Sequence, residues 1–198
     1  DWGRYADAFV ARVDKQGDLL WSRCIGGSRG DGAYDLASDG KGGVLIAGIT
    51  NSGDGDVTHH KGGHNFWLVN MDKRGNIVWE NCYGGTYASG AAVCRATDGS
   101  IWMGGVTGEG ASGGQVDEEF GYNDAWVIRT DASGNFLGGR VLGAPRGDEI
   151  MILHPLEGGV VMTGGHVGLE GFGGGKPGGT FPTVYGWRDV FLARIAPW

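Results

Sequence analysis

Acidic residues and histidines gather in one glycine-rich stretch, residues 51–64, which reads NSGDGDVTHHKGGH. The alternation of Asp54 and Asp56 with glycine suits the oxygen ligands that Ca²⁺ prefers, while His59 and His64 carry nitrogens that suit a transition metal. The stretch lacks the complete Asp-x-Asp-x-Asp-Gly spacing, and Gly-Asp-Gly-Asp is also common turn chemistry. We therefore expect an ordinary polar loop and no cofactor, and a calcium ion held by these four residues is the alternative.

Two further stretches, residues 108–123 and 168–188, combine carboxylates with aromatic rings. A glycan site uses both groups, because carboxylates accept hydrogen bonds from sugar hydroxyls while a ring covers one face of the sugar. The candidate ligand-binding residues are Asp117, Glu118, Glu170, Phe172, Tyr185 and Trp187. A solvated acidic loop with its own packing aromatics has the same composition. A glycosidase needs two carboxyls roughly 5–9.5 Å apart, and the spacing identifies no such pair, so we predict no catalytic residue.

These three stretches interrupt a repeat at equivalent positions. Its copies read DAFVARVDKQGDLLWSRCI from Asp7, NFWLVNMDKRGNIVWENCY from Asn65, DAWVIRTDASGNFLGGRVL from Asp124 and DVFLARI from Asp189. The copies start 58, 59 and 65 residues apart, a period typical of stacked supersecondary units. We take residues 1–198 as a single domain, with repeats of approximately 7–64, 65–123 and 124–188 and a final strand in 189–198.

Each repeat contains four strand signals separated by glycine-rich turns. In the first period the strands are predicted at residues 7–14, 19–25, 33–38 and 44–50. The glycine of each hairpin turn is expected because its position takes a positive φ. Four antiparallel strands in a period of this length are typical of a β-propeller blade. We predict an all-β fold, a β-propeller of four-stranded antiparallel blades with roughly three blades present.

Large aromatic rings recur at one position of the repeat, which is occupied by Phe9, Trp67, Trp126 and Phe191. A ring that recurs once per blade is most simply the filler between adjacent sheets. Cys24 and Cys82 also share a repeat position, and Cys94 has no counterpart. Equivalent strands of neighbouring units are usually too far apart for a disulfide, so we expect free and mostly buried thiols.

Charge and hydropathy narrow the possible partners. The chain has 43 glycines, 20% charged residues and a formal net charge of -7. Nucleic acids and anionic membrane surfaces require clustered Lys and Arg, whereas the 16 basic residues here are scattered. No apolar run approaches the roughly 20 residues that cross a bilayer. We expect neither a nucleic-acid partner nor membrane insertion.

The run D-A-F-V-A-R-V-D-x-x-G-x-L-x-W from Asp7, followed by G-G-S and by SDGKGGVLIAGITNS at residues 38–52, resembles the bacterial secreted β-propeller repeats of the SBBP or delta-60 type. It is also similar in layout to kelch repeats. The resemblance covers essentially the whole chain. It implies a bacterial protein that is extracellular or attached to the cell surface, often a module of a larger protein without assigned catalysis. The kelch-like phasing implies that residues 33–38 and 44–50 are inner strands and 66–71 and 77–83 outer strands of one blade.

That phasing gives 13 strands, which are too few for a ring because known propellers typically have at least four blades of four strands. We expect a partial propeller that is completed by further blades or by a protein partner, in preference to a simple dimer. An open end would leave a sheet face that a partner must cover.

The expected function is a noncatalytic extracellular or cell-surface scaffold or binding module. One alternative is a carbohydrate-binding, lectin-like module, which predicts saturable glycan binding that is lost on Trp187→Ala or Tyr185→Ala. The other alternative is a polysaccharide-acting enzyme with a carboxylate or metal site carried by the loops.

Overall fold

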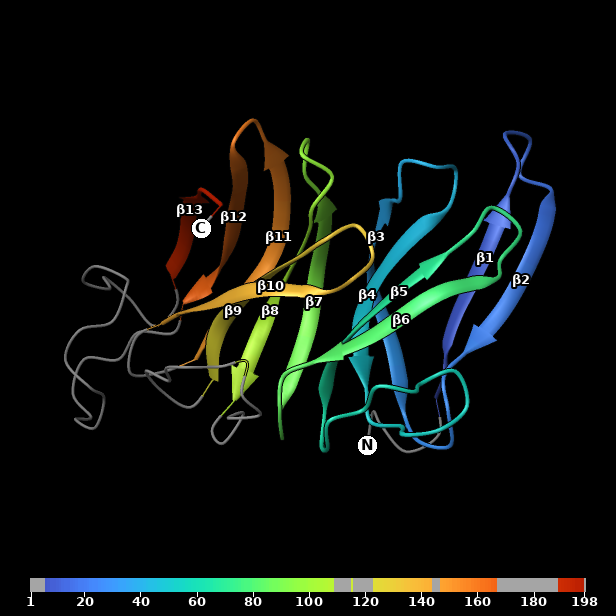
Figure 1. Ribbon diagram of the computed structural model, residues 1–198, viewed down its shortest axis with the longest axis horizontal. Helices are drawn as coiled ribbons and strands as arrows, with labels where there is room; N and C mark the ends of the chain where they lie inside the picture. The colour runs from blue at the N-terminus through green and yellow to red at the C-terminus, as the bar shows by residue number, and fades with distance from the viewer. Residues whose placement is uncertain (1–5, 109–114, 116–122, 144–146, 167–188, 198) are drawn as a thin grey trace.

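The chain folds into β-strands joined by tight turns and longer connections (Figure 1). The computed structural model describes residues 6–108, 115, 123–143, 147–166 and 189–197. Within these residues, 13 strands form four antiparallel sheets and no helix occurs. The all-β prediction is therefore confirmed, while the described strands form four separate sheets and no closed barrel or ring.

Every sheet is an antiparallel meander in which each strand pairs with the next one along the chain. The first sheet contains β1 (Ala8–Val13) and β2 (Leu19–Ile25). The second contains β3 (Asp31–Ser38), β4 (Val44–Thr50), β5 (Asn65–Met71) and β6 (Ile77–Tyr83). The third contains β7 (Ala88–Arg95), β8 (Ile101–Gly108), β9 (Asn123–Thr130) and β10 (Phe136–Leu142). The fourth contains β11 (Asp148–Leu156), β12 (Gly159–His166) and β13 (Asp189–Ile195). The second sheet thus joins the strand pairs that the kelch-like phasing places in one unit.

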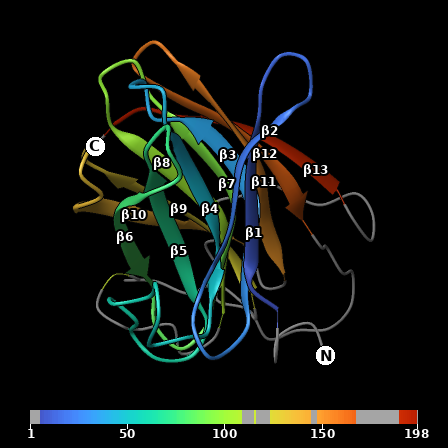
Figure 2. The same ribbon diagram turned by 90° about the vertical axis from the view of Figure 1, so that its right-hand side faces the viewer.

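The four sheets stack side by side in chain order, from β1–β2 to β11–β13 (Figure 1). Strand β7 contacts both β3 and β11, so the first strands of three successive sheets lie next to one another (Figure 2). We call β3, β7 and β11 the inner strands. The last strands, β6 and β10, form the opposite edges of the second and third sheets.

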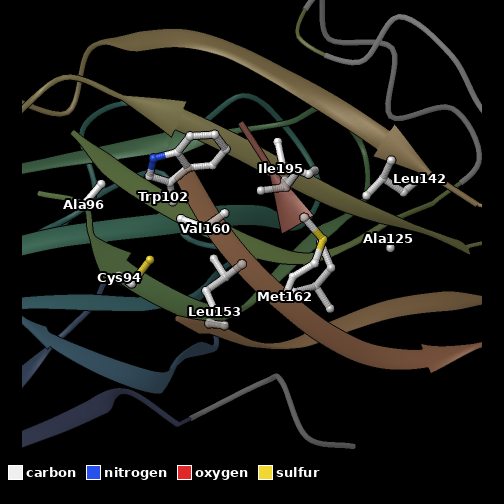
Figure 3. Close-up of a cluster of buried hydrophobic side chains, with 12 residues drawn as sticks. Cys94, Ala96, Trp102, Ala125, Leu142, Leu153, Val160, Met162 and Ile195 are labelled. Carbon is white, nitrogen blue, oxygen red and sulfur yellow. The ribbon is translucent and has the colours of Figure 1, made fainter. Parts of the chain in front are cut away.

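A separate hydrophobic layer fills each gap between neighbouring sheets. Because side chains alternate between the two faces of a strand, β5 serves two layers: Phe66 and Leu68 face the third sheet, while Trp67 packs with the first. Strand β9 alternates in the same way between the second and fourth sheets. Figure 3 shows the layer between the third and fourth sheets, where Trp102 and Met162 are fully buried. Each sheet with two neighbours is therefore apolar on both faces.

The recurring ring behaves differently from copy to copy. Trp67 and Trp126 are 1% and 0% exposed, which confirms the prediction that they fill the space between sheets. The prediction is wrong for Phe9, which is 65% exposed. Phe9 alternates with Ala8 and Val10, which face the second sheet, so its ring points to the other side, where no described sheet lies. Phe191 is partly buried against the third sheet.

Three hairpin turns share one hydrogen-bond pattern: those between β1 and β2, between β5 and β6, and between β9 and β10. One carboxylate oxygen of Asp14, Asp72 or Asp131 accepts hydrogen bonds from the backbone N–H groups two and four residues later, at 2.8–3.0 Å. The glycine that follows has the positive φ predicted from the sequence: Gly17 at 91°, Gly75 at 85° and Gly134 at 81°. Local polar contacts thus fix these hairpins without help from other sheets.

Each of these turns in the second and third sheets also contacts the preceding sheet. The Trp21 indole N–H donates to the Lys73 carbonyl at 3.0 Å, and the Tyr83 hydroxyl donates to the Gly134 carbonyl at 2.6 Å. A β-carbon at Gly134 would lie 2.8 Å from the Trp79 ring. The glycines are therefore needed twice, for the backbone conformation and for the close approach of a ring.

The three cysteines are free thiols. Cys82 and Cys94 are buried, as predicted, but Cys24 is exposed. Cys24 pairs with Phe9 across β1 and β2, so it shares the same uncovered face. Burial raises the pKa of the Cys94 thiol to about 12, which makes this group a poor nucleophile at neutral pH.

Candidate functional site

The aromatic and acidic residues predicted to bind a glycan lie outside the described residues. This applies to Asp117, Glu118, Glu170, Phe172, Tyr185 and Trp187. Their role stays a prediction. The loop of residues 51–64, which joins β4 to β5, is described in full and can be compared with its predicted calcium site.

Both aspartates of this loop contact the neighbouring first sheet and the connection that follows it. One Asp54 carboxylate oxygen accepts the Ser28 N–H at 2.7 Å, and hydrogen bonds from the backbone and hydroxyl of Ser28 lower the pKa of Asp54. Asp56 forms a 2.8 Å ion pair with Arg23 of β2. Its second carboxylate oxygen accepts the Gly26 N–H at 3.3 Å. The two aspartates therefore tie the loop to the adjacent unit.

The two predicted histidine ligands have other neighbours. The Nδ1 atom of His59 lies 2.8 Å from a carboxylate oxygen of Glu80. The ring of His64 packs edge-on against Tyr87, with ring centroids 5.7 Å apart. In the described part of the chain, no group of three or more His, Cys, Asp or Glu side chains is arranged to hold a metal ion. The structure thus does not bring Asp54, Asp56, His59 and His64 together, and calcium binding stays a prediction.

Glu80 of β6 is a buried carboxylate that the sequence analysis did not select. It is 6% exposed, and one oxygen accepts hydrogen bonds from the Thr58 N–H at 2.9 Å and from the Thr58 hydroxyl at 2.6 Å. The other oxygen accepts the Trp67 indole N–H at 3.1 Å. Burial by itself raises the pKa of Glu80, but the hydrogen bonds from Thr58, His59 and Trp67 outweigh it and lower the pKa.

This environment gives Glu80 a structural role. A general acid in glycoside hydrolysis needs a raised pKa, whereas Glu80 is held as a carboxylate that clamps the loop to the sheet. The other copies have Ser22 and Gly139 at the same repeat position. The one signal available in the sequence was the charge of Glu80 at a strand position where the other copies have a small residue.

Asp31, at the start of β3, is a second buried carboxylate, 5% exposed. It accepts hydrogen bonds from the Thr50 hydroxyl at 2.5 Å, the Ser52 hydroxyl at 2.8 Å and the Gly27 N–H at 2.7 Å. These donors come from the end of β4, from the loop that follows it and from the connection between β2 and β3. Asp31 therefore fixes the junction between two sheets.

Ser28 lies in a Gly-x-Ser-x-Gly run at residues 26–30, which the sequence analysis also missed. In hydrolases this pattern places a nucleophilic serine on a sharp turn between a strand and a helix. Here the run connects β2 to β3, and a strand follows it. Its serine is bonded to Asp54, so the run serves the junction between sheets.

The inner strands form a further candidate surface. Each contains a bulge of one residue at the same place: Tyr34 in β3, Ala91 in β7 and Met151 in β11. Bulges re-aim side chains and interrupt strand pairing. A groove of about 470 Å³ runs across the three strands, and Tyr34, Leu36 and Met151 are more than half exposed along it. This groove offers an aromatic and aliphatic binding surface. The sequence pattern did not predict the bulges that recur in its three strands.

Comparisons with known proteins add no assignment. No protein-family model matches the chain, and a search of curated proteins finds no match. Among the described residues, no helix is long and apolar enough to cross a membrane.

Proposed function

We propose that the chain is part of a β-propeller that acts as a noncatalytic scaffold or binding module, extracellular or on a bacterial cell surface. The observation that carries the proposal is that the apolar residues on its two outermost sheet faces occupy the same repeat positions as residues buried between its sheets. Further units of the same kind then cover these faces. The location rests on the resemblance to secreted repeats alone.

The exposed face of β13 corresponds, by repeat position, to a face of β5 that is buried against the third sheet. Val190 and Leu192 are 83% and 77% exposed. By repeat position they correspond to Phe66 and Leu68 of β5, which pack against the third sheet. An apolar face this exposed on one strand is unusual for a monomer and suits a protein interface.

The exposed face of β1 corresponds to the face of β9 that packs against β5 in the same internal interface. Phe9 corresponds to Trp126, whose ring packs against Phe66 with a centroid separation of 4.6 Å. The exposed faces at the two ends are therefore related as the two partners of an internal contact. Head-to-tail stacking of like units is the arrangement that this relation supports.

The buried carboxylates support the noncatalytic part of the proposal. Asp31 and Glu80 each accept three or more hydrogen bonds, so both carboxylates are committed to structural contacts. The pKa of Glu80 is lowered, whereas a general acid requires a raised pKa. Asp31 fixes the junction between two sheets, and Glu80 clamps the loop of residues 51–64 to its own sheet.

Light scattering over a range of concentrations tests the stacking. We expect the 20.7 kDa chain to associate reversibly into larger particles, and Phe9→Glu or Leu192→Glu to abolish this, because a charge would then be buried between sheets. Leu137→Glu is the matched control, since Leu137 is also half exposed but lies on β10 of the third sheet, which has a neighbouring sheet on each face. A wild-type chain that stays monomeric at every concentration would contradict the proposal.

A further inference from the structure

A cleft of about 450 Å³ lies at the turn end of the second and third sheets, opposite the end that carries the loop of residues 51–64 (Figure 1). Its walls come from the turn between β3 and β4, the turn between β5 and β6, and the end of β7. The residues that line the cleft include Lys41, Lys73, Arg74, Trp79 and Arg95. None of these was selected from the sequence as a site residue.

The cleft is locally basic in an acidic protein. Four of the 16 basic residues of the chain line it, although the formal net charge is -7. Within the described residues, the ion pairs are Arg23–Asp56, His59–Glu80 and Arg129–Asp98, so no carboxylate pairs with Lys41, Lys73 or Arg95. These cations are available to an external anion.

The two carboxylates of the cleft already have structural partners. Asp39 accepts the backbone N–H groups of Lys41 and Gly43 at 2.7 and 2.8 Å. Asp72 accepts those of Arg74 and Asn76 at 2.8 and 2.9 Å. Both carboxylates keep their negative charge, but the four cations of the cleft outnumber its two carboxylates.

Two side chains of the cleft lie directly against glycines. A β-carbon at Gly40 would collide with a terminal nitrogen of Arg95, so the guanidinium of the third sheet reaches across to the turn of the second and lies against Gly40. A β-carbon at Gly134 would lie 2.8 Å from the Trp79 ring. The indole is thereby held as one apolar wall of the cleft.

The repeat itself does not require these cations. The pairing of β7 with β8 places Asp98 where the second sheet has Lys41, and the third copy has Ala132 and Ser133 in place of Lys73 and Arg74. The positive charge is therefore a property of this cleft and not of the blade pattern.

We propose that this cleft binds an acidic oligosaccharide, whose uronate or sulfate groups pair with Lys41, Lys73 and Arg95 while a sugar ring packs on Trp79. Cations on separate turns suit a ligand with spaced anionic groups better than a single small anion, and an indole beside them suits the apolar face of a sugar. The overall negative charge opposes a nucleic acid, which needs a broad basic surface. The proposal is independent of the stacking of units, because the cleft lies wholly between two sheets of this chain.

Isothermal titration calorimetry with defined oligosaccharides tests the site. A galacturonic acid oligomer and a heparin-derived oligomer distinguish uronate from sulfate, while a neutral cello-oligosaccharide and inorganic sulfate serve as comparison ligands. We expect saturable binding of at least one acidic oligomer that weakens with added salt, and no comparable binding of the neutral sugar. Equal affinity for the neutral oligomer, equal affinity for inorganic sulfate or no saturable binding of either acidic oligomer would overturn the proposal.

A matched set of variants places the binding in the cleft. The double variant Lys41→Ala, Lys73→Ala should bind the acidic oligomer about tenfold more weakly, because two charge-assisted contacts are lost. Lys15→Ala removes the lysine at the repeat position of Lys73 from a turn that does not line the cleft, and it should leave the affinity unchanged. Circular dichroism checks that the variants fold. Equal loss in the double variant and the control, or no loss in either, would show that the ligand binds elsewhere.

Discussion

The two middle sheets and the two end sheets are built from the same repeat but have different surroundings. Trp126 of the third sheet is fully buried between neighbours, whereas Phe9 of the first sheet, at the same repeat position, is 65% exposed. Strand β5 is buried along its whole length, while β13 leaves Val190 and Leu192 exposed on one face. The repeat therefore specifies which residues face a neighbour, and the neighbour decides whether they are buried.

This difference also separates two kinds of stabilising contact. The aspartate-capped turns are satisfied within each hairpin, so they are alike in the first, second and third sheets. The aromatic layers and the contacts between rings and turns require a second sheet. Substitutions at equivalent positions can therefore separate the two contributions.

The largest expected effect comes from the recurring ring. Trp126→Ala should lower the free energy of unfolding by about 3–5 kcal/mol, because it empties a packed layer between two sheets. Phe9→Ala should change it by less than about 0.5 kcal/mol in the dissociated chain, since a solvent-exposed ring makes few contacts. Urea denaturation at low protein concentration measures both values. Similar losses for the two variants would mean that Phe9 is covered in solution.

A smaller contrast is expected at the turn glycines. Gly17→Ala should cost about 1–2 kcal/mol from the positive φ alone, because nothing lies within 4 Å of the added β-carbon. Gly134→Ala has the same backbone strain and adds a collision with Trp79, which should cost about 1–3 kcal/mol more. Urea denaturation of both variants gives the difference. If the two costs were equal, the ring at Gly134 would not be a firm contact.

The smallest effect concerns pH and is confined to the second sheet. The pKa of Glu80 lies below its ordinary value of 4.5, so the stability that its carboxylate contributes is present above that value and is lost as the pH falls through the lowered pKa. Glu80→Gln should cost about 1–2 kcal/mol at neutral pH, because the amide cannot accept all of the same hydrogen bonds.

Urea denaturation at neutral and acidic pH tests this assignment. The difference between wild type and Glu80→Gln should shrink as the pH falls through the lowered pKa of Glu80, because the wild-type carboxyl then also becomes neutral. Asp72 and Asp131 titrate in both proteins, since hydrogen bonds from Asn76 and Asn135 lower their pKa values, and they cancel in the comparison. A difference that stays constant with pH would show that the Glu80 charge contributes no stability.

Local pattern was enough to predict most of the strands. The predicted runs at residues 19–25, 44–50 and 77–83 coincide with β2, β4 and β6, because alternating apolar residues between glycine turns have few other solutions. The inner bulges at Tyr34, Ala91 and Met151 were not predicted, since a bulge depends on strand pairing and not on residue type.

The candidate site could be predicted only in part. The sequence shows that polar side chains gather in the loop of residues 51–64, but it does not show which residues they contact. Arg23 reaches Asp56 from the first sheet, and Glu80 reaches His59 from β6, and the local sequence pattern indicates neither contact. The basic cleft could not be predicted because its lysines and arginines lie on separate turns.

The sequence by itself determined the repeat, the strands, the aspartate-capped glycine turns and the face of each strand that carries the large ring. These depend on contacts within a few residues or on the two-residue alternation of a strand. Only the tertiary structure decided that Trp126 is buried and Phe9 exposed, that Glu80 becomes a clamp and that Arg95 reaches the turn at Gly40. Each of these depends on which sheet lies alongside, and the packing of one sheet on the next is not encoded in the local pattern of either.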